Sequence, residues 1–302
     1  MMSQLLRRLL LSQLLSGALL GWLLVNLSDM TLWLIVLSAL LLPLLLALLM
    51  TLTTFIKSRA PAGAAALGWR TLPKEYGVGL RLYIGQMPWA WRAPEIQLNG
   101  TKIPVLLVHG YLCNHRIWNR MVKRLQRAGH PVLAIELTPL FISIDDYAPQ
   151  LEQAVSALCR QTGAPQVALV GHSMGGLVIR AWLRACGAQR VARIVTLGTP
   201  HAGTQIDTQP KTPNGRQMAW HSSWLQTLAQ SESPGTRNLM RIALSPQDNI
   251  VYPQCEQVLD GAQVTVFSGL GHLALSQSSI VQTWILRQLE EVASPANPAT
   301  PR

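Results

Sequence analysis

The chain has 302 residues, of which 49% are hydrophobic and 13% are charged. Because the charged share is about half of that in an ordinary soluble domain, the composition excludes a disordered chain and indicates that part of the protein lies outside water. Lysine and arginine outnumber aspartate and glutamate by 25 to 14, which gives a net charge of +11 and favours an anionic neighbour. The apolar excess favours an anionic membrane surface, and we expect no nucleic acid partner because no recognised binding motif accompanies the basic residues.

Two long uncharged stretches, residues 9–27 and 31–56, lie near the N-terminus. Each is long enough to span a bilayer as a helix. Basic residues precede the first stretch and follow the second, Lys57 and Arg59 among them, whereas the turn between the stretches carries only Asp29. By the positive-inside rule both ends face the cytoplasm, so we predict that residues 1–56 form a two-span membrane anchor with the rest of the chain in the cytoplasm. One span plus an interfacial helix, or a cleaved signal peptide, are the alternatives.

Residues 57–95 are predicted to form a basic juxtamembrane linker. Between residues 57 and 92, Glu75 is the single acidic residue, and Trp69, Trp89 and Trp91 stand among the basic ones. Tryptophan and arginine together suit the headgroup layer of a membrane. For Trp89 and Trp91 the alternative is that they pack as core where the next domain begins.

The four cysteines are scattered without any Cys-x-x-Cys pair. They are Cys113, Cys159, Cys186 and Cys255. This spacing indicates neither a zinc site nor a redox motif, so we predict small core residues in a reducing compartment, no metal site and no cofactor.

From residue 96 onward, apolar runs alternate with helical patterns. The strand-like runs are residues 104–108, 132–137, 167–170, 194–197, 239–244 and 264–267, and the helical ones are 115–128, 145–159, 174–186 and 276–292. Such alternation predicts a three-layer α/β domain over residues 96–294, with a mostly parallel sheet covered on both faces, and a disordered tail over 295–302. Active sites in such domains lie at the carboxyl ends of the strands.

The strongest motif is Gly-His-Ser-Met-Gly-Gly at residues 171–176, where a buried strand ends and an apolar helix begins. A serine on such a strand-to-helix turn has strained backbone geometry, and the flanking glycines allow neighbouring backbone to approach. The helix that follows favours developing negative charge at its N-terminus. We therefore predict Ser173 as a nucleophile.

A serine nucleophile needs a histidine to accept its proton and an acid to orient that histidine. With a Gly-x-Ser-x-Gly motif, the acid and then the histidine follow the serine along the chain. Asp248 and His272 each come directly after a strand-like run, and we predict them as the acid and the base. His201 is the rival base, expected only to border the pocket, and Asp207 and Glu136 are the alternative acids.

The oxyanion that forms during attack on a carbonyl needs backbone donors that are already in place. One donor is predicted to be the amide of Met174, the residue after the nucleophile. The second comes from the loop after the first strand, where Tyr111 follows His109-Gly110. We expect His109 to be a buried histidine that supports this loop.

These motifs together resemble the α/β-hydrolase superfamily and, within it, the bacterial triacylglycerol lipases and esterases. The residues that carry the resemblance are 108–111, 171–176, 197–204, Asp248 and 271–272. It covers roughly residues 100–292 and not the first 95 residues. The resemblance implies an acyl-ester hydrolase in which the serine, acid and histidine named above form a catalytic triad and the two amides form its oxyanion hole. Many secreted relatives carry a signal peptide and a calcium site or disulfide, whereas this chain carries an apolar hairpin and no evident ligand cluster.

Residues 204–238 interrupt the alternation and are predicted to be an insertion over the site, because apolar residues stand there among turn formers. The sequence does not distinguish a mobile lid over an acyl-binding surface from a fixed cap packed on the core. The residues predicted to bind substrate are His109, His172, His201, Trp220, Trp224 and Leu225.

The favoured function is a membrane-anchored serine ester hydrolase that cleaves lipid or other acyl esters, with A-type cleavage of phospholipids as one option. A second hypothesis keeps the triad but transfers the acyl group to an alcohol or thiol. A third is a non-catalytic membrane scaffold, against which the intact triad order argues. Acyl-chain length, head group and oligomeric state are left open by the sequence.

Overall fold

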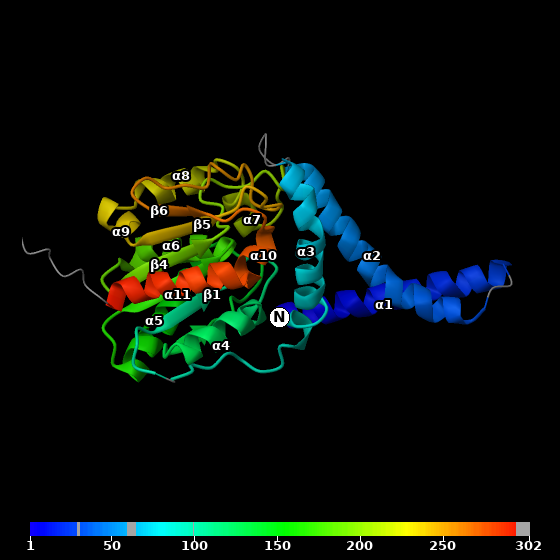
Figure 1. Cartoon of the computed structure of the whole chain (residues 1–302), viewed down its shortest axis with the longest axis horizontal. Helices are drawn as coiled ribbons and strands as arrows, with labels where there is room; N and C mark the ends of the chain where they lie inside the picture. The colour runs from blue at the N-terminus through cyan, green and yellow to red at the C-terminus, as the bar shows by residue number, and fades with distance from the viewer. Residues whose placement is uncertain (29–30, 59–64, 99, 294–302) are drawn as a thin grey trace, which may run out of the picture.

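The computed structural model describes residues 1–28, 31–58, 65–98 and 100–293. Figure 1 shows an α/β body and a helical arm that projects from it. The predicted tail at 295–302, and the charges of Asp29 and Arg59 used above to orient the arm, lie outside the described residues.

The body is built on a six-stranded sheet in which every neighbouring pair is parallel, in the order β2-β1-β3-β4-β5-β6. The strands are β1 (Val105–Val108), β2 (Val132–Ala134), β3 (Val167–His172), β4 (Val191–Leu197), β5 (Met240–Leu244) and β6 (Gln263–Val266). In the register, Leu169 of β3 lies between Leu106 of β1 and Ile194 of β4. All six apolar runs predicted as strands form strands, and their carboxyl ends meet at one edge of the sheet.

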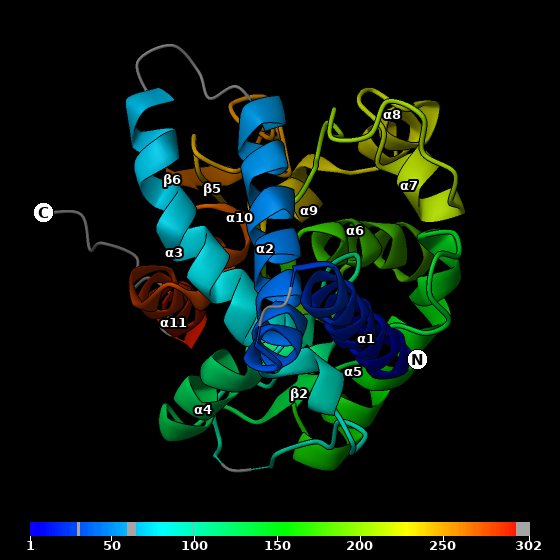
Figure 2. The same cartoon turned by 90° about the vertical axis from the view of Figure 1, so that its right-hand side faces the viewer.

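Helices cover both faces of this sheet, which confirms the predicted three-layer architecture (Figures 1 and 2). They are α4 (Asn119–Arg127), α5 (Ala148–Thr162), α6 (Met174–Cys186), α10 (His272–Gln277) and α11 (Ser279–Ala293), with 3-10 turns η1 (Met87–Trp89), η2 (His115–Trp118) and η3 (Asp145–Tyr147). Successive residues of a strand point to opposite faces. In β1, Leu106 packs in the core layer of α5 and α6, whereas Leu107 packs in the layer of α4, α10 and α11.

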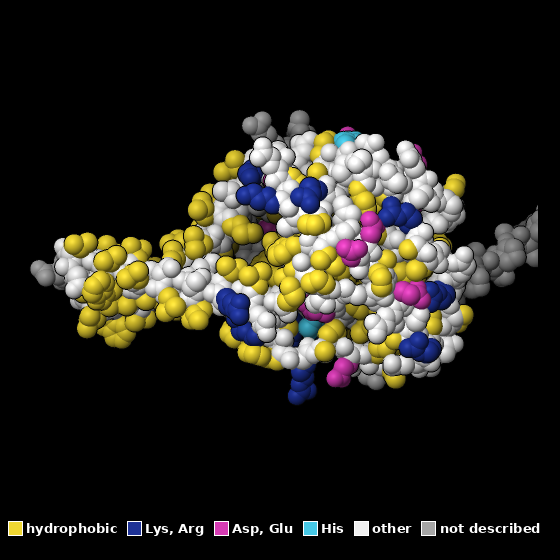
Figure 3. All heavy atoms as spheres, turned by 180° about the vertical axis from the view of Figure 1, so that it is seen from behind, with side chains coloured by type: hydrophobic (Ala, Val, Ile, Leu, Met, Phe, Trp, Pro, Cys, Tyr) yellow, Lys and Arg dark blue, Asp and Glu magenta, His cyan; other side chains and the backbone are white. Residues whose placement is uncertain are grey.

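The arm consists of α1 (Met2–Ser28) and α2 (Trp33–Ser58), which pack against each other in the projecting part, whereas the end of α2 runs beside α3 (Figures 1 and 2). Both helices are long and apolar enough to cross a membrane, a property that a signal sequence or a core helix shares. Apolar side chains cover the projecting part (Figure 3), and Trp33 is 78% exposed. At the base, by contrast, Met2, Leu6 and Phe55 are buried against the rest of the protein. The two-span arrangement remains a prediction.

The segment predicted as a linker contains a 19-residue helix, α3 (Ala65–Tyr83), which packs against α2 and α10. Leu82 and Met87 are fully buried in the core layer of α4 and α11, so this part of the chain belongs to the body. Trp89 and Trp91 are 41% and 68% exposed, and the idea that they form core is therefore wrong. 

The insertion at residues 204–238 forms three short helices, α7 (Pro213–Gln217), α8 (Ser223–Gln230) and α9 (Pro234–Asn238). Met218 and Leu225 are buried in the core layer of α5 and α6, so the insertion is packed on the body in this structure. All four cysteines are free, and Cys255 is exposed, which corrects the prediction that all four are core residues.

Candidate active site

Ser173 occupies the turn between β3 and α6 with φ 55° and ψ −129°. A positive φ is uncommon for a residue with a side chain and marks stored backbone strain. The turn is tight, since a Cβ added to Gly175 would lie 2.3 Å from the carbonyl oxygen of Val108. The serine therefore has the backbone geometry that its motif predicts.

His272 and Asp248 form a buried pair. Asp248 lies in the loop after β5, and His272 follows the loop after β6. The imidazole Nδ1 lies 2.8 Å from Asp248 Oδ2 and 3.1 Å from Oδ1, and Oδ1 also accepts the backbone N–H groups of Ile250 and Val251 at 2.9 and 2.8 Å. With Nδ1–H donated to the carboxylate, Nε2 is the nitrogen that can accept a proton. Among the described residues, no hydrogen bond joins the Ser173 hydroxyl to this nitrogen; such bonds are often long in proteins without bound substrate.

The surroundings of His272 favour its protonated form. Burial lowers the pKa of this imidazole, but the charge of Asp248 and its hydrogen bond raise the pKa by more. The net pKa therefore lies above the usual value of 6.5. This is the shift expected of a base that becomes an imidazolium during catalysis.

His172 packs against His272 and hydrogen-bonds its backbone. The two ring centroids are 4.7 Å apart, and Nε2 of His172 lies 3.1 Å from the carbonyl oxygen of His272. Burial, together with the charge of His272, lowers the pKa of His172 to about 3, so this ring is neutral. We correct the prediction that His172 contacts substrate, because the residue is 1% exposed and packs between Trp118 and His272.

The two predicted oxyanion donors are both available. Within the described parts of the chain, neither the amide of Tyr111 nor that of Met174 donates to a protein acceptor. His109 fixes the loop that carries Tyr111: its Nδ1–H donates to the Gly110 carbonyl at 2.9 Å, and its Nε2 accepts the N–H of Leu137 at 3.0 Å. With both nitrogens used and its pKa lowered by burial, His109 supports this loop in the structure, and its predicted contact with substrate stays a prediction.

His201, the rival base, lies in a buried polar cluster. Its Nε2 lies 3.0 Å from Thr196 Oγ1, and its Nδ1 lies 3.4 Å from a guanidinium nitrogen of Arg180. Burial and the charge of Arg180 lower its pKa well below 6.5. The ring is thus occupied by structural partners, which corrects its predicted place in substrate binding. 

Arg180 of α6 fastens the insertion to the nucleophile helix. Its guanidinium pairs with Glu232 at 2.5 and 3.1 Å, and the two side chains are 0% and 4% exposed. Leu225 is buried, which corrects its predicted place in substrate binding. Trp224 is partly buried and donates its indole N–H to Asp145 at 2.8 Å, and its role in substrate binding stays a prediction. Trp220 is partly exposed against His221 and remains a prediction.

The alternative acids lie elsewhere. Glu136 pairs with His115 at 2.6 Å, and hydrogen bonding to that histidine keeps the carboxyl pKa below its usual value against the opposing effect of burial. Asp207 is exposed and caps its own loop by accepting the N–H of Gln209. In the described part of the chain, neither residue hydrogen-bonds His272, whereas Asp248 does.

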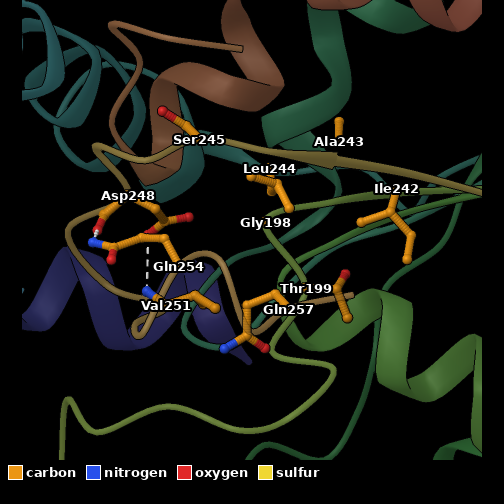
Figure 4. Close-up of a pocket in the computed structure, with 10 residues that line it drawn as sticks. All are labelled: Gly198, Thr199, Ile242, Ala243, Leu244, Ser245, Asp248, Val251, Gln254 and Gln257. Carbon is orange, nitrogen blue, oxygen red and sulfur yellow. Dashed lines mark hydrogen bonds between the residues drawn. The ribbon is translucent and has the colours of Figure 1, made fainter. Parts of the chain in front are cut away.

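Two pockets lie at this edge of the sheet. The first surrounds the loop of the acid, where Gln254 donates to the Asp248 carbonyl at 2.8 Å and the strand end at Leu244 forms a wall (Figure 4). The second lies at both oxyanion donors and is mostly apolar, with Leu140, Phe141 and Tyr147 beside Tyr111 and Met174. In the described ranges, no group of three or more His, Cys, Asp or Glu side chains is arranged to hold a metal ion.

Sequence reasoning missed several residues of this site. Phe141, which has a strained φ of 69°, belongs to none of the motifs named above. Asn249 accepts the backbone N–H of His272 at 3.0 Å, and only its place beside the acid could have drawn attention to it. Glu75 of α3 contacts the start of α10 next to His272. In the sequence it is marked out only as the single acidic residue of a basic segment.

Comparison with known proteins agrees with this fold. Residues 103–239 match the family described as alpha/beta hydrolase fold. A triacylglycerol lipase of Burkholderia plantarii is 33% identical over 160 residues, which cover 50% of this chain and 43% of that protein. A triacylglycerol lipase of Pseudarthrobacter phenanthrenivorans is 36% identical over 115 residues, 35% of each chain. The crystal structure of mature Bacillus licheniformis lipase BlEst2 superposes with a TM-score of 0.56 at 17% identity and covers 64% of this chain and 94% of that one.

The body therefore has the α/β-hydrolase fold, as the sequence motifs predicted. The chain spans less than half the length of these curated relatives, and the helical arm lies before the matched residues.

Proposed function

We propose that the protein is a membrane-anchored serine ester hydrolase. The observation that carries this proposal is the strained Ser173 turn beside the buried His272–Asp248 pair, with two unpaired amides next to it. The similarity to triacylglycerol lipases favours an acyl ester as the substrate class.

In the proposed mechanism, Ser173 Oγ attacks the ester carbonyl carbon while His272 Nε2 takes the hydroxyl proton. Asp248 holds the imidazole and stabilises the imidazolium. The amides of Tyr111 and Met174 donate to the oxyanion, which collapses as the alcohol leaves with the proton from His272. Water then attacks the acyl-serine in the same way and releases a carboxylic acid, so the enzyme returns to its starting state.

The apolar pocket beside the oxyanion donors supports a hydrophobic acyl chain as the bound group. Leu140 and Phe141 form part of its wall, and the rings of Phe141 and Tyr111 meet in a T-shaped arrangement with centroids 5.6 Å apart. The apolar arm supports a lipid substrate drawn from a membrane, including phospholipids through A-type cleavage.

We further propose that α1 and α2 span the membrane as a hairpin with the body on the cytoplasmic side. Three basic residues, Arg7, Arg8 and Lys57, lie at the base of the arm, where the start of α1 and the end of α2 pack near the body. Arg7 also places its guanidinium 4.1 Å from the ring centroid of the exposed Trp91, a pairing that suits a headgroup layer.

The test is to purify the full chain in detergent and to supply p-nitrophenyl esters of increasing acyl length, followed by acylglycerols and phospholipids in mixed micelles. We expect hydrolysis that is absent in the Ser173→Ala variant. Adding a long-chain alcohol distinguishes hydrolysis from acyl transfer, because transfer would yield a new ester. A folded protein that processes none of these esters would contradict the proposal.

A further inference from the structure

The buried carboxylate of Glu75 reaches the catalytic edge from a helix outside the matched α/β core. It is 3% exposed and accepts the backbone N–H groups of Leu273 at 2.7 Å and Ala274 at 2.9 Å. These partners lie 198 and 199 residues further along the chain. Both amides belong to the first turn of α10, which begins at His272, and first-turn amides have no acceptor within their own helix. Glu75 therefore caps the helix on which the proposed base stands.

The fit between α3 and α10 is close. A Cβ added to Gly271, the residue before His272, would lie 2.5 Å from Glu75 Oε2, so the carboxylate fills the space that a side chain would need there. At the other end of α10, Arg81 of α3 donates to Gln277 Oε1 at 2.7 Å. Helix α3 thus holds α10 at both of its ends, and Figure 1 shows the two helices adjacent.

Above about pH 7, Glu75 also carries negative charge toward the base. Burial raises the pKa of Glu75 to about 7, against two backbone hydrogen bonds that lower it. The ionised carboxylate raises the pKa of His272, as Asp248 does. The other titratable groups that face this cluster are His172, which packs on His272, and Tyr83 on the same helix as Glu75.

We propose that Glu75 is a positioning residue for His272: its carboxylate fixes the first turn of α10 and so holds the imidazole in register with Asp248 and Ser173. The inference rests on the proposed function, since it assigns His272 the role of base. It makes helix α3, which was predicted as part of a linker, a structural part of the proposed catalytic centre.

Two substitutions separate orientation from charge. Glu75→Asp keeps the negative charge but is one methylene shorter, so it cannot reach both amides. We expect its kcat to fall by up to about 100-fold with little change in KM, because a small displacement of a catalytic group is that costly. Glu75→Gln removes the charge, so we expect both a lower kcat and an acidic limb of kcat/KM that moves to lower pH. Glu95→Gln, the same change at an exposed acid, is the matched control and should behave as wild type.

A measurement without substrate keeps the inference separate from the proposed function. The pKa of His272 can be followed by NMR in histidine-labelled full-length protein in detergent, with His272→Ala to assign its signal. We expect this pKa to fall in Glu75→Gln and to stay near the wild-type value in Glu75→Asp. If the wild type cleaves no ester, the function fails while this titration still tests the Glu75 contact. A folded Glu75→Gln protein with the wild-type kcat and the wild-type pKa of His272 would overturn the inference. If Glu75→Gln does not fold, a wild-type kcat in Glu75→Asp overturns it equally.

Discussion

Thr54, near the end of the apolar helix α2, accepts a hydrogen bond from the side-chain amide of Asn249 at 2.7 Å. Asn249 follows the proposed acid Asp248, and its Oδ1 accepts the backbone N–H of His272 at 3.0 Å. One side chain therefore ties the arm to the loop of the acid and to the loop of the base. The arm contributes to the order of the site as well as to its surroundings.

Deleting residues 1–56 should therefore damage the enzyme beyond releasing it from the membrane. The deletion removes Thr54 and the buried side chains of Met2, Leu6 and Phe55, so it exposes apolar surface and leaves Asn249 without its acceptor. We expect a lower Tm and a lower kcat toward a soluble ester in detergent. Thr54→Val in the full chain isolates the hydrogen bond and should cost about 1 kcal/mol of unfolding free energy. A deletion protein with the stability and kcat of the full chain would show that the arm is only a tether.

Ser173→Ala should abolish ester hydrolysis and leave the protein folded, because the hydroxyl contributes chemistry and little packing. Loss of a triad nucleophile costs on the order of a million-fold in turnover, and His272→Ala should be comparable. His201→Ala should lower the stability of the protein and leave most of the hydrolysis rate, since the two ring nitrogens contact Thr196 and Arg180. Hydrolysis rates and covalent labelling by an organophosphonate measure these effects. Nearly silent His272→Ala combined with inactive His201→Ala would reverse the assignment of the base.

The pH dependence of kcat/KM should report the raised pKa of His272. The base must be neutral to accept the serine proton, so activity should fall as the pH drops through a value above 6.5. Because the negative charge of Asp248 stabilises the imidazolium, Asp248→Asn should move this limb to lower pH and also reduce kcat severely. Initial rates between pH 5 and pH 9 decide the matter. A wild-type limb centred below 6.5, or one that moves to higher pH in Asp248→Asn, contradicts the pairing.

What the sequence predicted well is what short motifs and local periodicity determine. The strands follow from apolar runs, and the Ser173 turn follows from a run that stops at Gly171. Chain order then selected Asp248 and His272. The helix around Glu75 was missed because its purpose is a contact 198 residues away, which no local pattern encodes. His172 and His201 were misassigned for a related reason: a histidine at a strand end can face the pocket or the core, and burial decides between them.

The buried pair of Arg180 and Glu232 should stabilise the attachment of the insertion to α6. Glu232→Gln leaves the Arg180 charge buried with a weaker partner, and breaking such a pair costs roughly 3–5 kcal/mol. We expect thermal unfolding at a clearly lower temperature, whereas Glu256→Gln at an exposed acid should change little. Unchanged stability in Glu232→Gln would mean that the pair does not fasten the insertion.

The exposed Cys255 offers a test of membrane orientation with a residue already present. Cys113 is buried, and replacing the partly buried Cys159 and Cys186 by alanine leaves Cys255 as the accessible thiol of the body. Since basic residues flank the arm at its base, the positive-inside rule predicts a cytoplasmic body for the proposed two-span arm. A membrane-impermeant maleimide should therefore leave Cys255 unlabelled in intact cells that express the chain and should label it in inverted vesicles, while Cys255→Ala removes the signal in both. Labelling in intact cells would refute the cytoplasmic placement and favour an arm that exports the catalytic body.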